Sequence, residues 1–374
     1  MTRRTLVLVG GGHAHALTLL AWARAPAPDT RLVLLSPQRF TPYSGMLPGH
    51  VAGHYEWRAF HIDLAPLAAA AGAELVIDRA VGLDPDARRL ERADGPALAF
   101  DLCSLDTGST SEPPPLPGGD THLHPVKPLD RFLDAWYGFL HRVELKRAAP
   151  AAAVLGGGVG GAELAMAMAH RLGAGARVTL IERGPDIARE LAPAVRRRLH
   201  RALDANGVTV RPATKAVAVD DAGVRTTAGE RVDAGFVTAA VGARPAPWLA
   251  ASGLAVTDDG FVAVDRQLRS TSHGHVFAAG DVAHLADPRP KAGVFAVRQG
   301  PVLHAALTAA LAGRTPPTYT PQADYLRLIS LGRKRALAVK YGRAVGGTGP
   351  LGALLWRLKD RIDRKFMATV DAGA

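Results

Sequence analysis

The chain has 374 residues, 48% of them hydrophobic and 21% charged, as is usual for a soluble globular protein of roughly two to three domains. Lys and Arg outnumber Asp and Glu by 45 − 34 = 11, and Cys103 is the single cysteine. No apolar run reaches the ~18 residues of a membrane-spanning helix, and a disulfide scaffold, a CxxC redox pair and a cysteine-ligated zinc site are excluded within one chain.

The positive charge is compatible with a solvated Arg-rich exterior, an anionic membrane surface or anionic cofactors. Nucleic acid is not expected as a partner, because no Lys/Arg block interleaved with aromatic residues occurs before the C-terminus. At the N-terminus, Arg3 and Arg4 precede an apolar run over 5–9 and imitate a twin-arginine export signal. The run ends in glycines and no cleavage site follows, so we predict a buried first strand and a cytoplasmic protein.

One order of elements occurs twice along the chain. A strand over 5–9 leads through Gly10 and Gly12 to a helix over 14–23 and a strand over 31–35, which is the opening of a dinucleotide-binding unit. The order returns at an offset of 156 − 10 = 146 residues. Its parts are a strand over 152–155, the glycines Gly156, Gly158 and Gly161, a helix over 162–172 and a strand over 177–181.

Each copy continues through short strands separated by turn residues, which predicts a small antiparallel layer beside each parallel sheet. A further strand and a glycine followed by prolines close each copy, at Thr107 and Gly108 in the first and at Gly242 in the second. We therefore predict an α/β fold with two Rossmann-like dinucleotide-binding domains and a small C-terminal α+β segment.

The second copy fits a dinucleotide site fully. A glycine turn at a helix N-terminus places backbone N–H groups and the helix dipole against a pyrophosphate. Glu182 lies 182 − 158 = 24 positions after Gly158, close to the ~20 expected of the acid that binds a ribose 2′-OH. A carboxylate there repels a 2′-phosphate, which favours NADH over NADPH, although Arg183 beside it opposes that preference.

The first copy departs from the pattern. His15 stands at the third glycine position, and the second strand ends in Ser36 instead of an acid. We expect His13 and His15 near the pyrophosphate and flavin, where they can donate hydrogen bonds to phosphate. A metal site is not expected, since no third ligand has suitable spacing.

The two units, with His275-Val-Phe-Ala-Ala-Gly280-Asp281 near the end, resemble the pyridine nucleotide–disulfide oxidoreductase superfamily of flavoproteins. The resemblance implies FAD in the first site, NAD(P)H in the second, and Gly280 and Asp281 against the ribityl chain of the flavin. It implies a discontinuous FAD-binding domain (1–118 and 266–322), an inserted NAD(P)H-binding domain (119–265) and a C-terminal segment (323–374).

Within the superfamily, the stretch over 40–49, which includes Pro42, and the terminal pattern Trp356-x-x-Lys-Asp-x-Ile-Asp-x-x-Phe-Met367 are similar to one branch. That branch is encoded beside, or fused to, selenide, water dikinase, which implies a link to that enzyme. Type II NADH dehydrogenases and sulfide:quinone oxidoreductases are broader relatives.

The resemblance and the lone Cys103 together predict the chemistry. Disulfide reductases and sulfide:quinone oxidoreductases need cysteines that this chain lacks. We therefore predict an FAD-dependent NAD(P)H oxidoreductase, with hydride transfer from NADH to FAD and then to a quinone or another non-thiol acceptor. The alternative is a nucleotide-binding partner or regulatory flavoprotein of low turnover, linked to selenium metabolism.

Two candidate catalytic residues follow from the relatives. Glu163, in the pattern GxGxxGxE, is expected near nicotinamide and flavin, or else is a first-turn acid that complements the helix dipole. Lys291 is expected at the N1–C2 edge of the flavin, where a cation stabilises the anionic reduced form. Type II NADH dehydrogenases carry glutamines at the positions of Val294 and Arg298, and only Gln299 remains here, which argues against quinone.

The last segment predicts a basic amphipathic helix. Its apolar residues recur at helical spacing and are Leu351, Leu354, Leu355, Leu358, Ile362 and Phe366. Its basic residues are Arg357, Lys359, Arg361, Arg364 and Lys365. The apolar face is expected to pack on the protein itself or on a partner subunit, as in a homodimer, or to lie in an anionic membrane interface at the inner face of the membrane.

Overall fold

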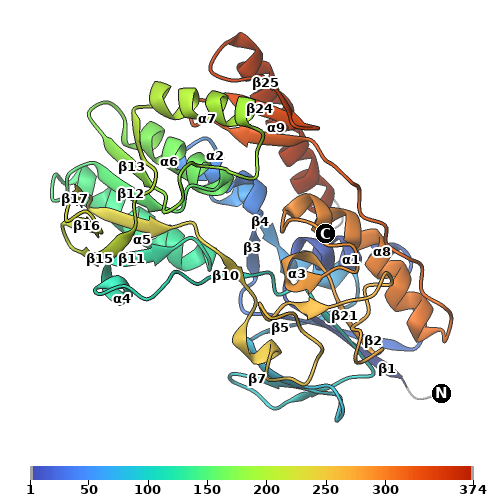
Figure 1. Ribbon diagram of the computed structural model, residues 1–374. Helices are drawn as coiled ribbons and strands as arrows, with labels where there is room; N and C mark the ends of the chain where they lie inside the picture. The colour runs from blue at the N-terminus through green and yellow to red at the C-terminus, as the bar shows by residue number, and fades with distance from the viewer. Residues whose placement is uncertain (1–2, 372–374) are drawn as a thin grey trace.

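The structure, a computed structural model, describes residues 3–371. Two five-stranded parallel sheets with their helices form two units, and the C-terminal segment contacts both of them (Figure 1). Small antiparallel sheets complete the architecture. The predicted fold class is confirmed.

The first unit is built on a sheet with the strand order β21-β9-β1-β2-β5. Its strands are β1 (Arg4–Val9), β2 (Thr30–Ser36), β5 (Glu74–Ile77), β9 (Leu102–Leu105) and β21 (Val276–Ala278). Consecutive residues of β1, Leu6, Val7 and Leu8, are all fully buried. The sheet is therefore covered on both faces, which explains why β1 is a continuous apolar run instead of an alternating one.

The second unit repeats this plan with the order β11-β18-β12-β13-β14. Its strands are β11 (Leu123–Pro125), β12 (Ala151–Leu155), β13 (Arg177–Ile181), β14 (Val208–Arg211) and β18 (Phe236–Ala239). The two orders match position by position, with β12 in the place of β1. The edge strands β21 and β11 occupy equivalent positions, but β21 is the last strand of its sheet along the chain, whereas β11 is the first of its own. The internal duplication is thus a duplication of topology.

Helices of the two units contact their sheets and each other. They are α1 (His13–Arg24), α2 (Leu47–Val51), α3 (Leu64–Ala70), α4 (Gly119–His122), α5 (Leu129–Glu144), α6 (Val159–Leu172), α7 (Pro193–Ala205) and α8 (Gly293–Leu311). On α5, Phe132, Trp136 and Phe139 recur at helical spacing and are buried against Phe236 of β18. Burial of aromatic rings of this size is a large favourable term in folding, and it fixes α5 against the second sheet.

The predicted antiparallel layers are present in both units. They are the meander β6 (Ala80–Asp84), β7 (Arg89–Arg92) and β8 (Leu98–Ala99), and the meander β15 (Ala216–Asp220), β16 (Gly223–Thr226) and β17 (Arg231–Asp233). Three two-stranded sheets are formed by β3 (Phe40–Pro42) with β4 (His61–Asp63), β10 (Thr110–Ser111) with β19 (Ala243–Arg244), and β20 (Val262–Ala263) with β22 (Ala283–His284). The pair β10–β19 joins the segment after β9 to the segment after β18, and so connects the two units.

Helix α8 is the single helix within residues 3–371 that is long and apolar enough to cross a bilayer, with a mean hydropathy of 1.2. The sequence contains no uninterrupted apolar run of that length, because Arg298 and Gln299 lie within it. Half of this apolar stretch of α8 is buried in the protein. Helix α8 packs along α1, as Figure 1 shows for the orange and dark blue helices. A core helix meets the same criteria of length and composition, so α8 is weak evidence for a membrane span.

The C-terminal segment consists of the antiparallel strands β23 (Arg327–Ser330), β24 (Ala336–Lys340) and β25 (Arg343–Gly346), followed by the helix α9 (Pro350–Asp371). The prediction of a helix is confirmed, and of the alternatives for its apolar face, packing on the chain itself is excluded for most of the residues, while a partner subunit and a membrane interface stay predictions. Four of the six apolar residues, Leu351, Leu354, Leu358 and Ile362, are 42–58% exposed.

The buried positions of α9 include a charged pair in place of those leucines. Lys359 and Asp363 are 9% and 4% exposed, and their side chains form an ion pair of 2.5 Å. The Lys359 ammonium also donates to the Gly45 carbonyl oxygen at 2.7 Å, which ties α9 to the first unit. Helical periodicity located the apolar stripe of α9, but the face that turns inward is the one with this pair, Met367 and Val370.

Candidate flavin and nicotinamide sites

A cavity of about 640 Å³ lies at the carboxyl ends of β1, β2 and β9. Open α/β sheets bind ligands at this edge, outside the ends of their strands. Most of the residues predicted for the first site line it, namely Gly10, Gly12, His13, Ser36, Pro42, Thr107, Gly108, Gly280 and Asp281. Motifs separated by more than 250 residues are therefore brought together at one cavity.

The glycines of the first turn are required by their neighbours. Gly10 has φ +95°, a conformation that side chains rarely adopt, and a Cβ on it would collide with the Asp106 carbonyl oxygen. A Cβ on Gly12 would overlap the Asp106 carboxyl group. The turn thus brings the N-terminus of α1 against the loop after β9, where the Asp106 carboxyl group accepts the backbone N–H of His15.

His15 does not have the predicted role. Its ring is fully buried, and its Nδ1 and Nε2 lie 2.7 Å from the Gly10 carbonyl oxygen and 2.8 Å from Ser104 Oγ. Both ring nitrogens are therefore used inside the protein, and the ring cannot donate to a phosphate. His15 instead joins the glycine turn to β9, a structural role at the position where other dinucleotide sites have their third glycine.

His13, in contrast, lines the cavity. Burial lowers the pKa of its ring to about 4, so the ring is neutral at physiological pH and carries one N–H donor. The ring packs edge-on against Tyr43 and Phe366, at centroid distances of 5.0 and 5.9 Å. Phe366 belongs to α9, so the C-terminal helix contributes to the wall behind this part of the cavity.

The donor set of the cavity fits a dinucleotide cofactor. Thr107 Oγ1 is buried and has no hydrogen-bond partner within the protein. A buried hydroxyl without a partner is costly unless a ligand or ordered water satisfies it. Together with the glycine turn and the helix N-terminus, Thr107 offers the N–H and O–H donors that a diphosphate and its ribose would accept. The residues present therefore fit FAD.

Asp281 is held by a residue that the sequence did not single out. The Lys127 ammonium lies 2.9 Å from Asp281 Oδ2 and 2.8 Å from Ser109 Oγ, and all three residues line the cavity. Burial opposes ionisation of Asp281, but the charge and hydrogen bond of Lys127 outweigh it and keep the pKa of the carboxyl below its usual range. Lys127 lies two residues after β11, and no local motif marks it, because only the fold brings it to Asp281.

Lys291 is directed elsewhere than predicted. Its ammonium donates to the Ala283 carbonyl oxygen at 2.5 Å and lies 4.0 Å from the centre of the Phe261 ring. Burial lowers its pKa to about 8, against the opposing charge of Asp281. Lys291 does not line the described cavity. Lys127, in contrast, lines the cavity, and the role expected of Lys291 at the flavin stays a prediction.

Gln299 is buried and its Oε1 accepts the backbone N–H of Gly280 at 2.6 Å. It therefore holds the turn that presents Asp281 and does not face an electron acceptor.

Glu163 lies beyond the first turn of α6, so it is not the first-turn acid that was one of the expectations, and it faces the C-terminal segment. One of its carboxylate oxygens accepts the backbone N–H of Ser330, in β23, at 2.7 Å. Burial raises the pKa of the carboxyl to about 7, while the Ser330 N–H and the charge of Lys359 oppose the rise. Glu163 does not line the described cavity. It joins α6 to β23, an observation that neither of the two sequence-based interpretations included.

The second glycine turn has the geometry of a pyrophosphate site. Gly156 has φ +107°, and a Cβ on Gly161 would collide with the Gly156 carbonyl oxygen. Around Gly158, in contrast, the position of a Cβ is open for 4 Å. The turn thus needs glycine for packing at two positions and leaves a third free for close approach of a ligand.

Glu182 is placed beside this turn, as predicted. Its two carboxylate oxygens accept the backbone N–H groups of Gly157 and Gly184, at 2.7 and 2.6 Å. These bonds fix the carboxylate at the end of β13, next to the helix N-terminus. Gly242, with φ +39°, follows β18 at the same edge of the sheet.

Cys103 lies in β9 and is fully buried. Burial raises the pKa of its thiol far above its usual range. The thiolate is the reactive form of cysteine, so this side chain has no redox or nucleophilic role.

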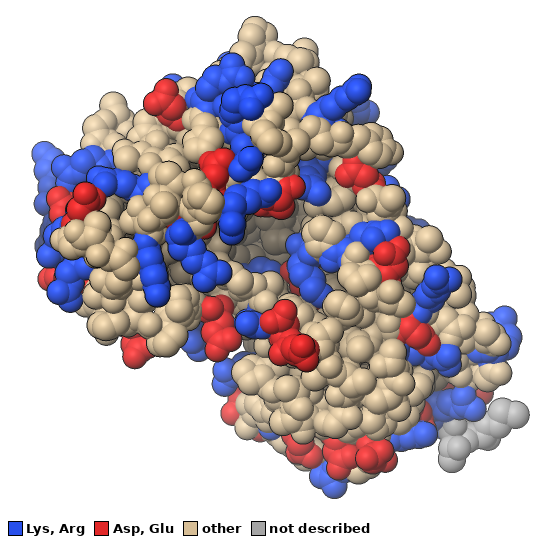
Figure 2. Space-filling view, in the orientation of Figure 1, with Lys and Arg blue, Asp and Glu red and all other residues tan. Residues whose placement is uncertain are grey.

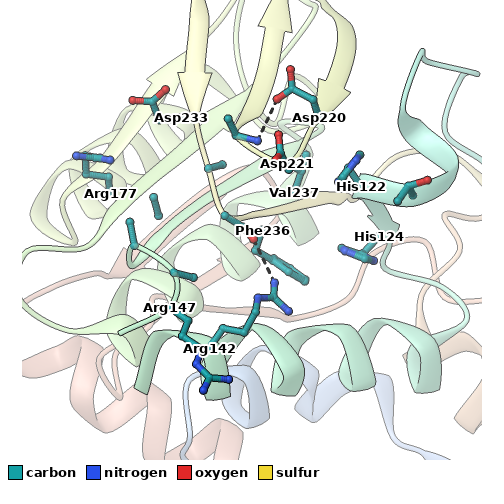
Figure 3. Close-up of a pocket in the computed structure, with 17 residues that line it drawn as sticks. His122, His124, Arg142, Arg147, Arg177, Asp220, Asp221, Asp233, Phe236 and Val237 are labelled. Carbon is teal, nitrogen blue, oxygen red and sulfur yellow. Dashed lines mark hydrogen bonds between the residues drawn. The ribbon is translucent and has the colours of Figure 1, made fainter. Parts of the chain in front are cut away.

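A second cavity, of about 510 Å³, lies at the opposite edge of the second sheet, where β12, β13 and β18 begin. Figure 3 shows Arg142 and Arg147 on one side of it and Asp220, Asp221 and Asp233 on the other. This cavity is remote from the glycine turn and does not belong to the dinucleotide site.

The chain belongs to the pyridine nucleotide-disulphide oxidoreductase family, whose sequence profile matches residues 4–300. It is therefore an FAD-dependent NAD(P)H oxidoreductase, and with a single cysteine it has no redox disulfide.

Particular relatives are more distant. An NADH dehydrogenase-like protein of Mycobacterium tuberculosis is 29% identical over 306 residues, which cover 76% of this chain and 73% of that protein. The demethylphylloquinone reductase NdbB of Synechocystis is 28% identical over 275 residues, which cover 70% and 66%.

Among solved structures, two superpose on this one with TM-scores of 0.80. They are a sulfide:quinone oxidoreductase of Aquifex aeolicus, at 17% identity and covering 99% of this chain and 92% of that one, and NDH2 of Plasmodium falciparum in complex with NADH, at 12% identity and 98% of both chains. At these identities the likeness is one of fold.

Proposed function

We propose that this protein oxidises NADH and transfers the two electrons to a quinone-class acceptor at a membrane surface. The balanced reaction is NADH + H⁺ + quinone → NAD⁺ + quinol. Bound FAD supplies the hydride and electron-transfer chemistry, and the protein supplies binding, orientation and electrostatics.

The observation that carries the proposal is the state of Cys103. A thiol that is fully buried in β9 cannot relay electrons, and it has no second cysteine to pair with. Electrons therefore leave the flavin without passing through a thiol, which agrees with a quinone and disfavours a disulfide acceptor. The name of the Synechocystis relative, a demethylphylloquinone reductase, supports the same class of acceptor.

The residues of the two sites take separate roles in this proposal. Glu182 binds the adenosine ribose of NADH and rejects a 2′-phosphate by charge. Asp281, held by Lys127, accepts hydrogen bonds from the ribityl hydroxyls of the flavin. Thr107 Oγ1 and backbone N–H groups at the N-terminus of α1 donate hydrogen bonds to the diphosphate and ribose of FAD.

The exposed face of α9 supports a membrane surface as the site of action. Its leucines are bordered by Arg357, Arg361 and Lys365, so an apolar stripe and cations occur together on one exposed helix. An amphipathic helix of this composition binds the interface of anionic lipids through both features. An acceptor with a long apolar tail would be available at the same surface.

The proposal is tested by anaerobic titration of the flavin-loaded protein with NADH. We expect the flavin absorbance to bleach within seconds at one NADH per flavin, and to return when a soluble quinone is added. NADH-inert flavin would contradict the proposal and favour a binding or regulatory role instead. If NADH reduces the flavin but no quinone reoxidises it, the assignment of NADH as the electron donor stands and a quinone-class acceptor is excluded.

A further inference from the structure

Asp106 is a buried carboxyl group in the wall of the flavin cavity, directly before Thr107 and Gly108, and the sequence assigned it no role. It follows β9 directly, is 4% exposed, and lies between the two glycine turns of the first unit. A Cβ on Gly12 would overlap its carboxyl group on one side, and a Cβ on Gly280 would overlap Oδ1 on the other. Both glycines are thus needed because Asp106 fills the space between them.

The carboxyl group is placed at the N-terminus of α1. Its Oδ2 accepts the backbone N–H of His15 at 3.0 Å, in the first turn of the helix. This end of the helix is where a dinucleotide diphosphate binds in such folds. An ionised Asp106 would put a negative charge beside the two negative charges of the diphosphate, in a region with little water to screen them.

We infer that Asp106 binds the flavin diphosphate as a neutral carboxylic acid, so that the protein takes up a proton when FAD binds. The acid O–H would donate a hydrogen bond to a diphosphate oxygen, while Oδ2 continues to accept from His15. The inference rests on FAD binding at this cavity. It adds that the affinity for FAD depends on pH through one named group.

In the free protein Asp106 titrates near neutral pH instead of in the usual acidic range. Burial raises the pKa of Asp106 to about 7, the charge of Asp281 adds to the rise, and the backbone N–H groups of His15 and Ala14 oppose it. The diphosphate adds further negative charge and raises this pKa again. Because the bound state then holds the proton more tightly than the free state, the Kd for FAD increases with pH above about 7.

Other ionisable groups face this region from the neighbouring elements. On α1, burial lowers the pKa of both His13 and His15 to about 4, so neither changes charge above neutral pH. After β21, the pKa of Asp281 is below its usual range, held there by Lys127 against burial. Lys291, with a pKa of about 8, is the other group that titrates near neutral pH, and its loss of charge would also weaken anion binding.

The test is calorimetric titration of FAD into the flavin-stripped full-length protein between pH 7 and 9, in buffers of different ionisation enthalpy. The dependence of the binding heat on the buffer counts the protons taken up. For the wild type we expect net uptake approaching one proton per FAD, and a Kd that rises by up to about tenfold per pH unit. For D106N, which keeps the shape and supplies an amide donor, we expect most of the proton uptake to be lost, a Kd that rises with pH only as far as Lys291 loses its charge, and tighter binding than the wild type at pH 9.

Two variants serve as controls. D101N removes another carboxylate of the same β-strand region, which accepts the Thr5 N–H at 2.7 Å, and should keep the proton uptake. K291Q should also keep it. If D106N does not fold, the infrared difference spectrum of the wild type on FAD binding must contain a protonated-carboxyl band that shifts with ¹³C-labelled aspartate.

FAD binding without proton uptake, or equal uptake in D106N, overturns the inference and leaves the oxidoreductase assignment intact. Loss of the uptake in K291Q would assign it to Lys291 and overturn the inference as well. A chain that binds no FAD at any pH overturns both.

Discussion

At the scale of single residues, the carboxylate of Glu182 is the group on which nucleotide choice depends. The backbone N–H groups of Gly157 and Gly184 fix it beside the glycine turn, so it cannot turn away from a 2′-phosphate without losing two charge-assisted hydrogen bonds. Arg183, next to it in the chain, is exposed. The geometry therefore favours NADH.

We expect Glu182→Ala to change the ratio of kcat/KM for NADH over NADPH by roughly tenfold to a hundredfold in favour of NADPH, because one interaction of about 1.5–3 kcal/mol with the ribose is lost and the repulsion is removed. Steady-state kinetics with both nucleotides measures the ratio. The exposed Glu190 of the same loop supplies the matched control, Glu190→Ala, which should leave the ratio unchanged. An unchanged ratio in E182A would contradict the assignment.

Lys127 and Asp281 act as a pair, and their substitution tests the flavin site. We expect Lys127→Met and Asp281→Ala each to raise the Kd for FAD, since each removes a charge-assisted hydrogen bond worth roughly 1.5–3 kcal/mol. Because the two side chains share a bond of 2.9 Å, the double variant should lose less than the sum of the two. Flavin fluorescence on rebinding gives the three constants. Purification of either single variant with full flavin and wild-type affinity would exclude this role.

At the scale of elements, α9 has the reverse of the usual amphipathic arrangement, with a charged pair buried and a leucine stripe exposed. A buried pair is costly to break from one side, because removal of one partner leaves an unpaired charge in a dry site. The bond from Lys359 to the Gly45 carbonyl oxygen and the bond from Tyr43 Oη to Asp363 Oδ1 therefore fix the rotation of α9 about its own axis. This rotation is what leaves the leucines exposed.

We expect L354E/L358E to abolish binding to vesicles of anionic lipid and to slow the reduction of long-tailed quinones, with no loss of thermal stability, because both side chains are exposed. V81E places the same charge at a position of β6 that is 49% exposed, and should bind vesicles as the wild type does. Co-sedimentation at low and high salt provides the measurement. Truncation after Gly349 should abolish vesicle binding as well, but unlike L354E/L358E it should lower Tm, since it removes the contacts of Lys359 and Asp363.

If the leucine face instead forms a dimer interface, the wild type should not sediment with vesicles and L354E/L358E should become monomeric. That outcome would overturn the membrane proposal.

How far the sequence could predict the molecule differs between its elements. The glycine turns were predictable, because a positive φ at Gly10 and Gly156 and a tight turn before a helix permit few alternatives. The partner of Asp281 could not be predicted, because Lys127 lies 154 residues away in the sequence and belongs to no motif. The packed face of α9 could not be predicted either, since helical periodicity identifies an apolar stripe but does not show whether other parts of the protein cover it. The domain limits and the link to selenide, water dikinase stay predictions.

At the scale of the whole molecule, the excess of 11 positive charges acts on anionic substrates before they bind. Figure 2 shows Lys and Arg side chains on both sides of a hollow on the face in view. Basic side chains around a concave surface raise the local concentration and the association rate of anions, and salt screens the effect over about 10 Å at 0.1 M.

We therefore expect kcat/KM for NADH to fall several-fold from low to high salt, while kcat at saturation changes little. Reduced nicotinamide riboside, which lacks the phosphates, is the control and should show no comparable dependence. Stopped-flow reduction of the flavin under anaerobic conditions separates association from hydride transfer. Equal salt dependence for the two donors would exclude electrostatic steering.

The contacts of His15 have a consequence for the history of this protein. The His15 ring bridges the Gly10 carbonyl oxygen and Ser104 Oγ, so the side chains of residues 15 and 104 depend on each other, whereas the backbone N–H of residue 15 binds Asp106 whatever its side chain. Glycine at position 15 would remove the ring, and Ser104 Oγ would lose its hydrogen bond to His15 Nε2. In related chains we accordingly expect residues 15 and 104 to be exchanged as a pair, and chains with glycine at position 15 to lack the serine at position 104.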